Sequence, residues 1–156
     1  YNISPYGFIK ELLALIQLRI KAAPCLEARV VLNIPRDRYD TSAAQFLVAK
    51  FRDNTWRKLW KASLPKPQGF YDPRSLELKK EHQAVFHVKT VVADERLLVT
   101  SANLSDNAQK HNCELGIHYP HSGHADAVWE HFGLLIGRGV LMPVEANPDP
   151  SNELES

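Results

Sequence analysis

Five side chains that could act together on a phosphate lie between residues 87 and 114. His87 and Lys89 are two residues apart. Ser101 and Asn103 follow, and Glu114 lies beyond them. If residues 85–93 form a strand, His87 and Lys89 project from the same face, about 7 Å apart along the strand axis. The set supplies a nucleophile, a cation, neutral donors and a carboxylate to orient the nucleophile, which indicates phosphoryl transfer.

Chance is the alternative explanation for this pattern. A histidine beside a lysine on a strand is usually an ordinary surface pair. The spacing H-x-K-x4-D, to which His87, Lys89 and Asp94 conform, arises by chance in roughly 2% of chains of this composition. Requiring S-x-N at a set distance, here Ser101 and Asn103, lowers that fraction to roughly one in ten thousand. We therefore interpret the segment as a functional site.

The same residues resemble the signature of the phospholipase D superfamily, in which H-x-K-x4-D is followed by G-S-x-N. The resemblance is detailed from about Val85 to Tyr119 and looser over the helix–strand units on either side. Thr100 stands where the family has glycine, and the stretch between Asp94 and Ser101 is one residue shorter than usual, which a tighter hairpin would absorb. The resemblance implies the fold of one phospholipase-D-like half, with one motif per chain.

The resemblance also implies a role for each matched residue. His87 would be the nucleophile that attacks phosphorus and forms a phosphohistidine. Lys89 and Asn103 would bind the phosphoryl oxygens, and Ser101 would support the oxyanion or the neighbouring carboxylate. Glu114 would hold the far ring nitrogen of His87 in the required tautomer.

The family mechanism needs a second histidine as general acid, whereas this chain has one H-x-K pair. Asp94, at an odd offset from His87 and at the expected turn, is interpreted as a structural hydrogen-bond acceptor of the motif. Single-motif members form a homodimer whose two motifs face each other across a shared site, and we expect the same here. The alternative is a second motif upstream of Tyr1, since the S-P-Y start resembles the loop after the first strand of this fold.

Metal and redox sites are not indicated, and the resemblance implies no cofactor. His118, His121 and His124 lack the H-E-x-x-H spacing and lie around a turn, so we interpret them as surface residues. Cys25 and Cys113 are far apart and form no C-x-x-C pair, which favours a reduced, cytoplasmic protein.

The elements that must position the site alternate between helix and strand, which predicts an α/β domain with a mixed β-sheet flanked by helices. We expect N-caps at Ser4, at Thr41 or Ser42, and at Ser122. The expected helices cover 5–23, 41–52, 55–63 and 122–136, the strands cover 29–34, 85–93, 97–100, 114–119 and 140–144, and 64–73 is a proline-rich loop. Residues 1–144 form the catalytic domain and 145–156 a disordered acidic tail.

A basic stretch around residues 52–66 suggests a surface for nucleic-acid phosphates. Arg57, Lys58 and Lys61 are its candidate contacts, whereas Trp56 and Trp60 are expected in the core. The formal net charge of +1 does not by itself indicate a nucleic-acid partner. No apolar run approaches the roughly 20 residues that cross a bilayer.

The resemblance does not decide whether the substrate is nucleic acid or phospholipid. The S-A-N-L-S and N-C-E-L-G runs look like those of phospholipase-D-like nucleases of bacterial restriction and phage-defence systems. We therefore expect a metal-independent phosphodiesterase that cleaves nucleic acid, with DNA favoured over RNA. The alternatives are an enzyme that cleaves or transfers phospholipid, for which the sequence shows no convincing membrane-docking segment, and a catalytically idle nucleic-acid-binding subunit of a larger complex.

Overall fold

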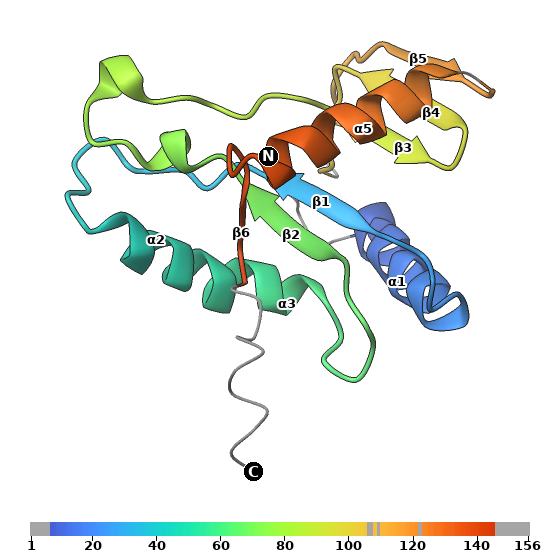
Figure 1. Cartoon of the computed structure of the whole chain (residues 1–156), viewed down its shortest axis with the longest axis horizontal. Helices are drawn as coiled ribbons and strands as arrows, with labels where there is room; N and C mark the ends of the chain where they lie inside the picture. Colours follow the sequence, from blue (N-terminus) through green and yellow to red (C-terminus); the bar gives the residue numbers. More distant parts are fainter. Residues whose placement is uncertain (1–6, 106–107, 109, 122, 146–156) are drawn as a thin grey trace.

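The computed structural model describes residues 7–105, 108, 110–121 and 123–145, and shows an α/β protein (Figure 1). Its helices are α1 (Gly7–Ala22), α2 (Ala44–Phe51), α3 (Arg57–Leu59) and α5 (Gly123–Gly137), with a π-helical stretch (Arg52–Trp56) that joins α2 to α3. Its strands are β1 (Arg29–Leu32), β2 (Gln68–Tyr71), β3 (Thr90–Ala93), β4 (Arg96–Thr100), β5 (Gly116–Tyr119) and β6 (Met142–Pro143). Two 3-10 turns cover Pro73–Leu76 and Lys80–His82.

The strands form two three-stranded sheets, so the expectation of a single mixed sheet was wrong. The first sheet has the order β1-β2-β6, with β1 and β2 parallel and β6 antiparallel. The second has the order β3-β4-β5 and is antiparallel throughout. Residues 83–89 are extended but outside any strand, and the amide of Phe86 donates to the side-chain oxygen of Asn33 at 3.1 Å. Asn33 lies just after β1, and it accepts this bond with its side chain and not with its backbone carbonyl, as a β-ladder would require. The strand expected over 85–93 begins only at Thr90.

Strand β2 lies where the sequence predicted a loop. Pro67 comes directly before the strand and Pro73 after it, so neither proline removes a donor from the ladder. Gly69 lies against Trp56, and a Cβ at this position would be 2.7 Å from the indole ring. The absence of a side chain at Gly69 lets the ring of Trp56, from another element, pack directly on the backbone of β2.

The main core lies between the first sheet and α1, α2 and α3 (Figure 1). Trp56 and Trp60 are buried with ring centroids 5.3 Å apart in an edge-to-face arrangement, which confirms the expectation that both are core residues. The buried amide of Gln17 accepts from the backbone N–H of Lys61 and donates to its carbonyl, so its polar atoms are satisfied. The remaining buried members are Ile9, Leu13, Leu32, Ile34, Leu47, Tyr71, Leu76 and Val144.

The start of α2 differs from the expected cap. The N-cap is Ala43, which has no side-chain oxygen, so the expectation of Thr41 or Ser42 was wrong. The amide of Ser42 is instead held by the carboxylate of Asp40 at 2.8 Å, and Arg36 binds the carbonyls of both residues. These contacts stabilise the approach to the helix. The expected caps at residues 4 and 122 and the tail from residue 146 lie outside the described residues.

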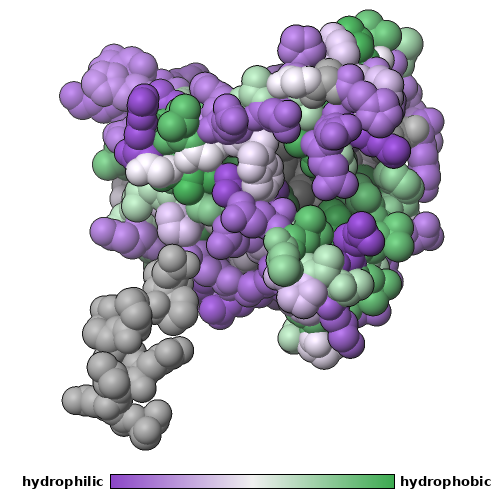
Figure 2. All heavy atoms as spheres, turned by 45° about the vertical axis from the view of Figure 1, so that its right-hand side comes forward, coloured by the Kyte–Doolittle hydropathy of each residue, from purple (hydrophilic) through white to green (hydrophobic). Residues whose placement is uncertain are grey.

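Helix α1 carries apolar side chains on two faces. Ile9 and Leu13 point into the core, whereas Phe8, Leu15 and Leu18 are 56%, 62% and 52% exposed. Apolar surface gathers on the side of the molecule that α1 occupies (Figure 2). Among the described helices, none is both long and apolar enough to span a bilayer.

Candidate active site

The segment that leads into β3 presents its two sides to different surroundings. Four alternate residues on one side line a cavity of about 130 Å³ beneath α5, namely Phe86, Val88, Thr90 and Val92. His87 and Lys89 lie between these residues and project from the opposite side. They therefore share one side of the chain, as the spacing predicted, although they precede the strand and are not part of it.

His87 and Lys89 are in direct contact. The ammonium of Lys89 lies 3.1 Å from Nδ1 and 3.3 Å from Nε2 of the exposed imidazole, and 3.2 Å from the His87 carbonyl. A neutral imidazole has one acceptor nitrogen, and the tautomer decides which of the two nitrogens accepts from the ammonium. The lysine therefore lies against the ring that a histidine nucleophile would use.

Glu114 is held from both of its oxygens. The hydroxyl of Ser101 donates to one oxygen in a short contact, and the Asn112 side-chain amide donates to the other at 3.0 Å. The backbone N–H of Leu115 in turn donates to the Ser101 hydroxyl at 3.1 Å. The hydrogen bonds from Ser101 and Asn112, together with the positive charge of Lys89, hold the pKa of Glu114 below its ordinary value. The carboxylate is thus kept ionised and fixed in direction beside the lysine.

Thr100 connects the two parts of this cluster. Its backbone N–H donates to the carbonyl of Lys89 at 3.0 Å, which continues the β3–β4 ladder to the residue before the start of β3. The following residue, Ser101, donates its own N–H to the carbonyl of Leu115 at 2.9 Å, beside the start of β5. The ends of three chain segments therefore bring His87, Lys89, Ser101 and Glu114 to the same end of the second sheet.

Asn103 and Asp94 have different positions relative to this cluster. Asn103 is half-buried in the turn after β4, two residues beyond Ser101. Asp94 begins the two-residue turn between Ala93 and Arg96 with φ of +51°, a conformation that aspartate tolerates better than most residues. This turn lies about 13 Å along the strand from Thr90, at the other end of the hairpin. The structure does not bring Asp94 to the cluster. The turn between β3 and β4 has two residues, which makes the hairpin a tight one.

The implied role of Glu114 as the partner of the His87 ring remains a prediction. The carboxylate makes its hydrogen bonds to Ser101 and Asn112, while the ring of His87 faces Lys89. Sequence reasoning did not assign a role to Asn112 or to Thr100. The signal for Asn112 was its position two residues before Glu114, because alternate residues of an extended chain lie on the same side.

Comparison with known proteins adds no relative. No protein-family model, curated protein or solved structure matches the chain.

Within the described ranges, no three side chains among His, Cys, Asp and Glu gather closely enough to hold a metal ion. Of the histidines considered for a metal site, His121 pairs with Glu95 at 3.2 Å.

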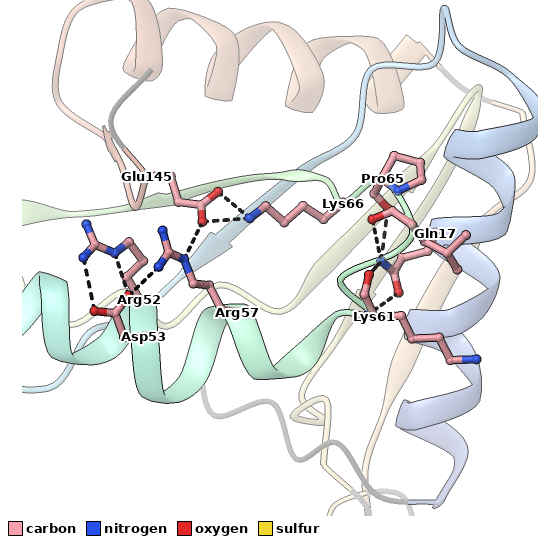
Figure 3. Close-up of polar contacts among 9 residues, drawn as sticks. Gln17, Arg52, Asp53, Arg57, Lys61, Pro65, Lys66 and Glu145 are labelled. Carbon is pink, nitrogen blue, oxygen red and sulfur yellow. Dashed lines mark hydrogen bonds and ion pairs between the residues drawn. The ribbon is translucent and has the colours of Figure 1, made fainter. Parts of the chain in front are cut away.

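The basic residues proposed to bind nucleic acid are partly engaged in ion pairs (Figure 3). Arg57 contacts Asp53 at 3.0 Å and Glu145 at 3.2 Å, and Lys66 also contacts Glu145 at 2.7 Å. Glu145 was expected to begin the tail, but these contacts tie it to the domain. Helix α3 also covers the face of the first sheet opposite α5 (Figure 1), so this basic surface is not beside the second sheet that carries His87.

Proposed function

We propose that the chain is a metal-independent phosphodiesterase that cleaves nucleic acid through a phosphohistidine at His87. The observation that carries this proposal is the contact between Lys89 and the His87 ring next to the Ser101–Glu114 pair. Four residues that span 28 positions of sequence meet at one end of a small sheet. His87, Lys89 and Ser101 belong to the motif that resembles the phospholipase D signature, and Glu114 is the carboxylate to which the resemblance gives a supporting role.

The proposed reaction has two displacements at phosphorus. A ring nitrogen of His87 forms a bond to phosphorus while the bond to the leaving ester oxygen breaks, and that oxygen takes a proton from the general acid. Water then attacks the phosphohistidine, the nitrogen–phosphorus bond breaks, and the proton from water returns to the general acid. The His87 of a second copy would serve as this acid in a homodimer, because the chain contains one H-x-K pair.

Lys89 has two positions in this mechanism. In the structure its ammonium lies against the His87 ring, close to both ring nitrogens. A bound phosphodiester presents anionic oxygens that attract the lysine more strongly than a neutral ring nitrogen does. Movement of the ammonium from the ring to a phosphoryl oxygen would expose the nucleophile and stabilise the charge that develops in the transition state.

Nucleic acid is proposed as the substrate because of the resemblance to small phospholipase-D-like nucleases. The Arg57, Lys58 and Lys61 surface lends limited support, since Arg57 is paired with two carboxylates. An idle nucleic-acid-binding subunit is the alternative that retains the same partner without the reaction.

One observation favours the phospholipid alternative. The exposed stripe of Phe8, Leu15 and Leu18 on α1 is an apolar surface of the kind that docks on a bilayer. Lys10 and Lys21 are exposed on the same helix, where they could contact anionic head groups. The sequence alone did not separate this stripe from the face of α1 that packs into the core.

A substrate panel tests the proposal. The chain is incubated with single- and double-stranded DNA and RNA and with vesicles of phosphatidylcholine, and products are separated by size or by release of head group. We expect cleavage of nucleic acid that His87→Ala lowers by a factor on the order of 10⁴ or more. His121→Ala, at the far end of the second sheet, is the matched control and retains activity. Head-group release alone would select the lipid alternative, and binding without cleavage would select the idle subunit.

A further inference from the structure

The hydroxyl of Thr100, the last residue of β4, bridges two segments of the candidate site. It accepts the backbone N–H of Ala102 at 3.0 Å and donates to the carbonyl of Leu115 at 3.3 Å. The first bond closes a turn in which a threonine side chain replaces a backbone acceptor. The second ties that turn to the residue that follows Glu114. A glycine, which the phospholipase D signature has at this position, could make neither bond.

Ser101 shares a hydrogen-bond partner, Leu115, with this bridge. The carbonyl of Leu115 accepts from both the Thr100 hydroxyl and the Ser101 amide, and the Leu115 amide donates to the Ser101 hydroxyl. The hydroxyl accepts this bond with one of its two lone pairs and donates its proton to Glu114. Thr100 is the register partner of Gly116 in the β4–β5 ladder, and the glycine places no side chain beside the hydroxyl.

We propose that Thr100 is a positioning residue whose hydroxyl holds Ser101 against Glu114 and sets the turn that carries Asn103. The proposal rests on the proposed function, since it concerns the same site. The phospholipase D signature has glycine at this position. The threonine of this chain adds a side chain whose hydroxyl makes two hydrogen bonds, and these would hold the turn in one conformation. Loss of the hydroxyl would loosen Ser101, Asn103 and Glu114 together without removing any of them.

Three substitutions separate the hydroxyl from the shape of the side chain. Thr100→Val keeps the branched shape and the strand preference but removes both bonds. Thr100→Ser keeps the hydroxyl, and Thr90→Val on the neighbouring strand is the matched control. We expect Thr100→Val to lower kcat about tenfold or more with KM within about threefold, and Thr100→Ser to restore most of the loss. Equal kcat in folded Thr100→Val and wild type would overturn the proposal, with Thr100→Ala taking its place if the valine variant does not fold.

A second measurement does not need activity. The Ser101 hydrogen bond is the largest cause of the low pKa of Glu114, so the pKa of this carboxyl should rise in Thr100→Val and stay low in Thr100→Ser. Carboxyl NMR titration of the full chain follows this directly. If wild type cleaves no substrate but the pKa of Glu114 shifts as expected, the proposed function fails and the positioning role of Thr100 stands. An unchanged pKa in Thr100→Val contradicts that role whether or not the chain is an enzyme.

Discussion

Lys89 lies against His87 with its ammonium 3.1 Å from Nδ1 and 3.3 Å from Nε2 of the ring. If His87 is the nucleophile, as proposed, this cation is close enough to the reacting ring to bind the phosphate that the ring attacks. The lysine would then have a measurable role of its own, separate from the chemistry of the ring.

Replacement of Lys89 tests that role. Lys89→Met keeps much of the length of the side chain and removes its charge, so we expect kcat to fall about 10²- to 10³-fold, the usual loss when one donor to the transition state is removed. Steady-state kinetics on the cleaved substrate measure the change. Lys79→Met, at an exposed lysine, is the control and should match wild type. Wild-type kcat in folded Lys89→Met would contradict the role assigned to Lys89.

Catalysis is expected to continue without divalent metal. In the proposed mechanism His87 would supply the attacking atom, and Lys89 and Asn103 would supply the charge stabilisation that metal ions supply in many nucleases. Cleavage should therefore persist in excess EDTA. Because one imidazole must be neutral while its twin is protonated, the rate should also show a bell-shaped dependence on pH. Activity that disappears with EDTA and returns with magnesium contradicts the phosphohistidine mechanism.

The active form is expected to be a homodimer. The given sequence has one H-x-K pair, and in the proposed mechanism the second histidine is the His87 of another copy, facing the same phosphate. Light scattering at micromolar concentration should give twice the monomer mass. Specific activity should also fall on dilution below the dissociation constant. A protein that is active as a strict monomer would require a general acid other than a second His87.

The basic surface is expected to give nucleic-acid affinity that falls steeply with salt. If Lys58 or Lys61 binds a phosphate, its replacement by alanine should lower the slope of log affinity against log salt by about 1. Fluorescence anisotropy with a labelled oligonucleotide at several salt concentrations measures this slope. Arg57→Ala is less suitable, because it also breaks the ion pairs with Asp53 and Glu145. An unchanged slope in both lysine variants excludes this surface as the binding site.

Gly69→Ala is expected to destabilise the fold. The new Cβ would lie 2.7 Å from the Trp56 ring, and overpacking of this kind costs about 1–3 kcal/mol. Urea unfolding followed by tryptophan fluorescence reports the free energy of unfolding. Gly137→Ala is the control, because a Cβ there meets nothing within 4 Å. Equal stability of Gly69→Ala and wild type would show that the packing of Trp56 on β2 is looser than described.

Local spacing was sufficient for part of the structure. His87 and Lys89 share a side because residues two apart in an extended chain do so whether or not a strand forms. The helical period likewise placed Trp56 and Trp60, four residues apart, on one buried face. The hairpin followed from the short spacing between its strands, with the turn at Asp94. In each case the relevant residues are neighbours in sequence, so the short-range geometry of the backbone was enough.

Long-range contacts decided the rest. Strand β2 lies in a proline-rich segment, where it pairs with β1 and β6 and its Gly69 packs against the ring of Trp56, 13 residues earlier. The basic residue Arg57 is paired with Glu145, 88 residues away, so its charge is less available than the sequence suggested.

The order of amino acids was enough to predict the α/β class and the placement of His87 and Lys89 on one side of the chain. Three further features depend on how the chain folds in three dimensions. The strands divide into two sheets, Lys89 covers His87, and Ser101 and Asn112 hold Glu114. Side-chain partners are chosen by distance in space, so a pattern along the chain predicts which face a residue occupies but not which residue from another segment meets it there.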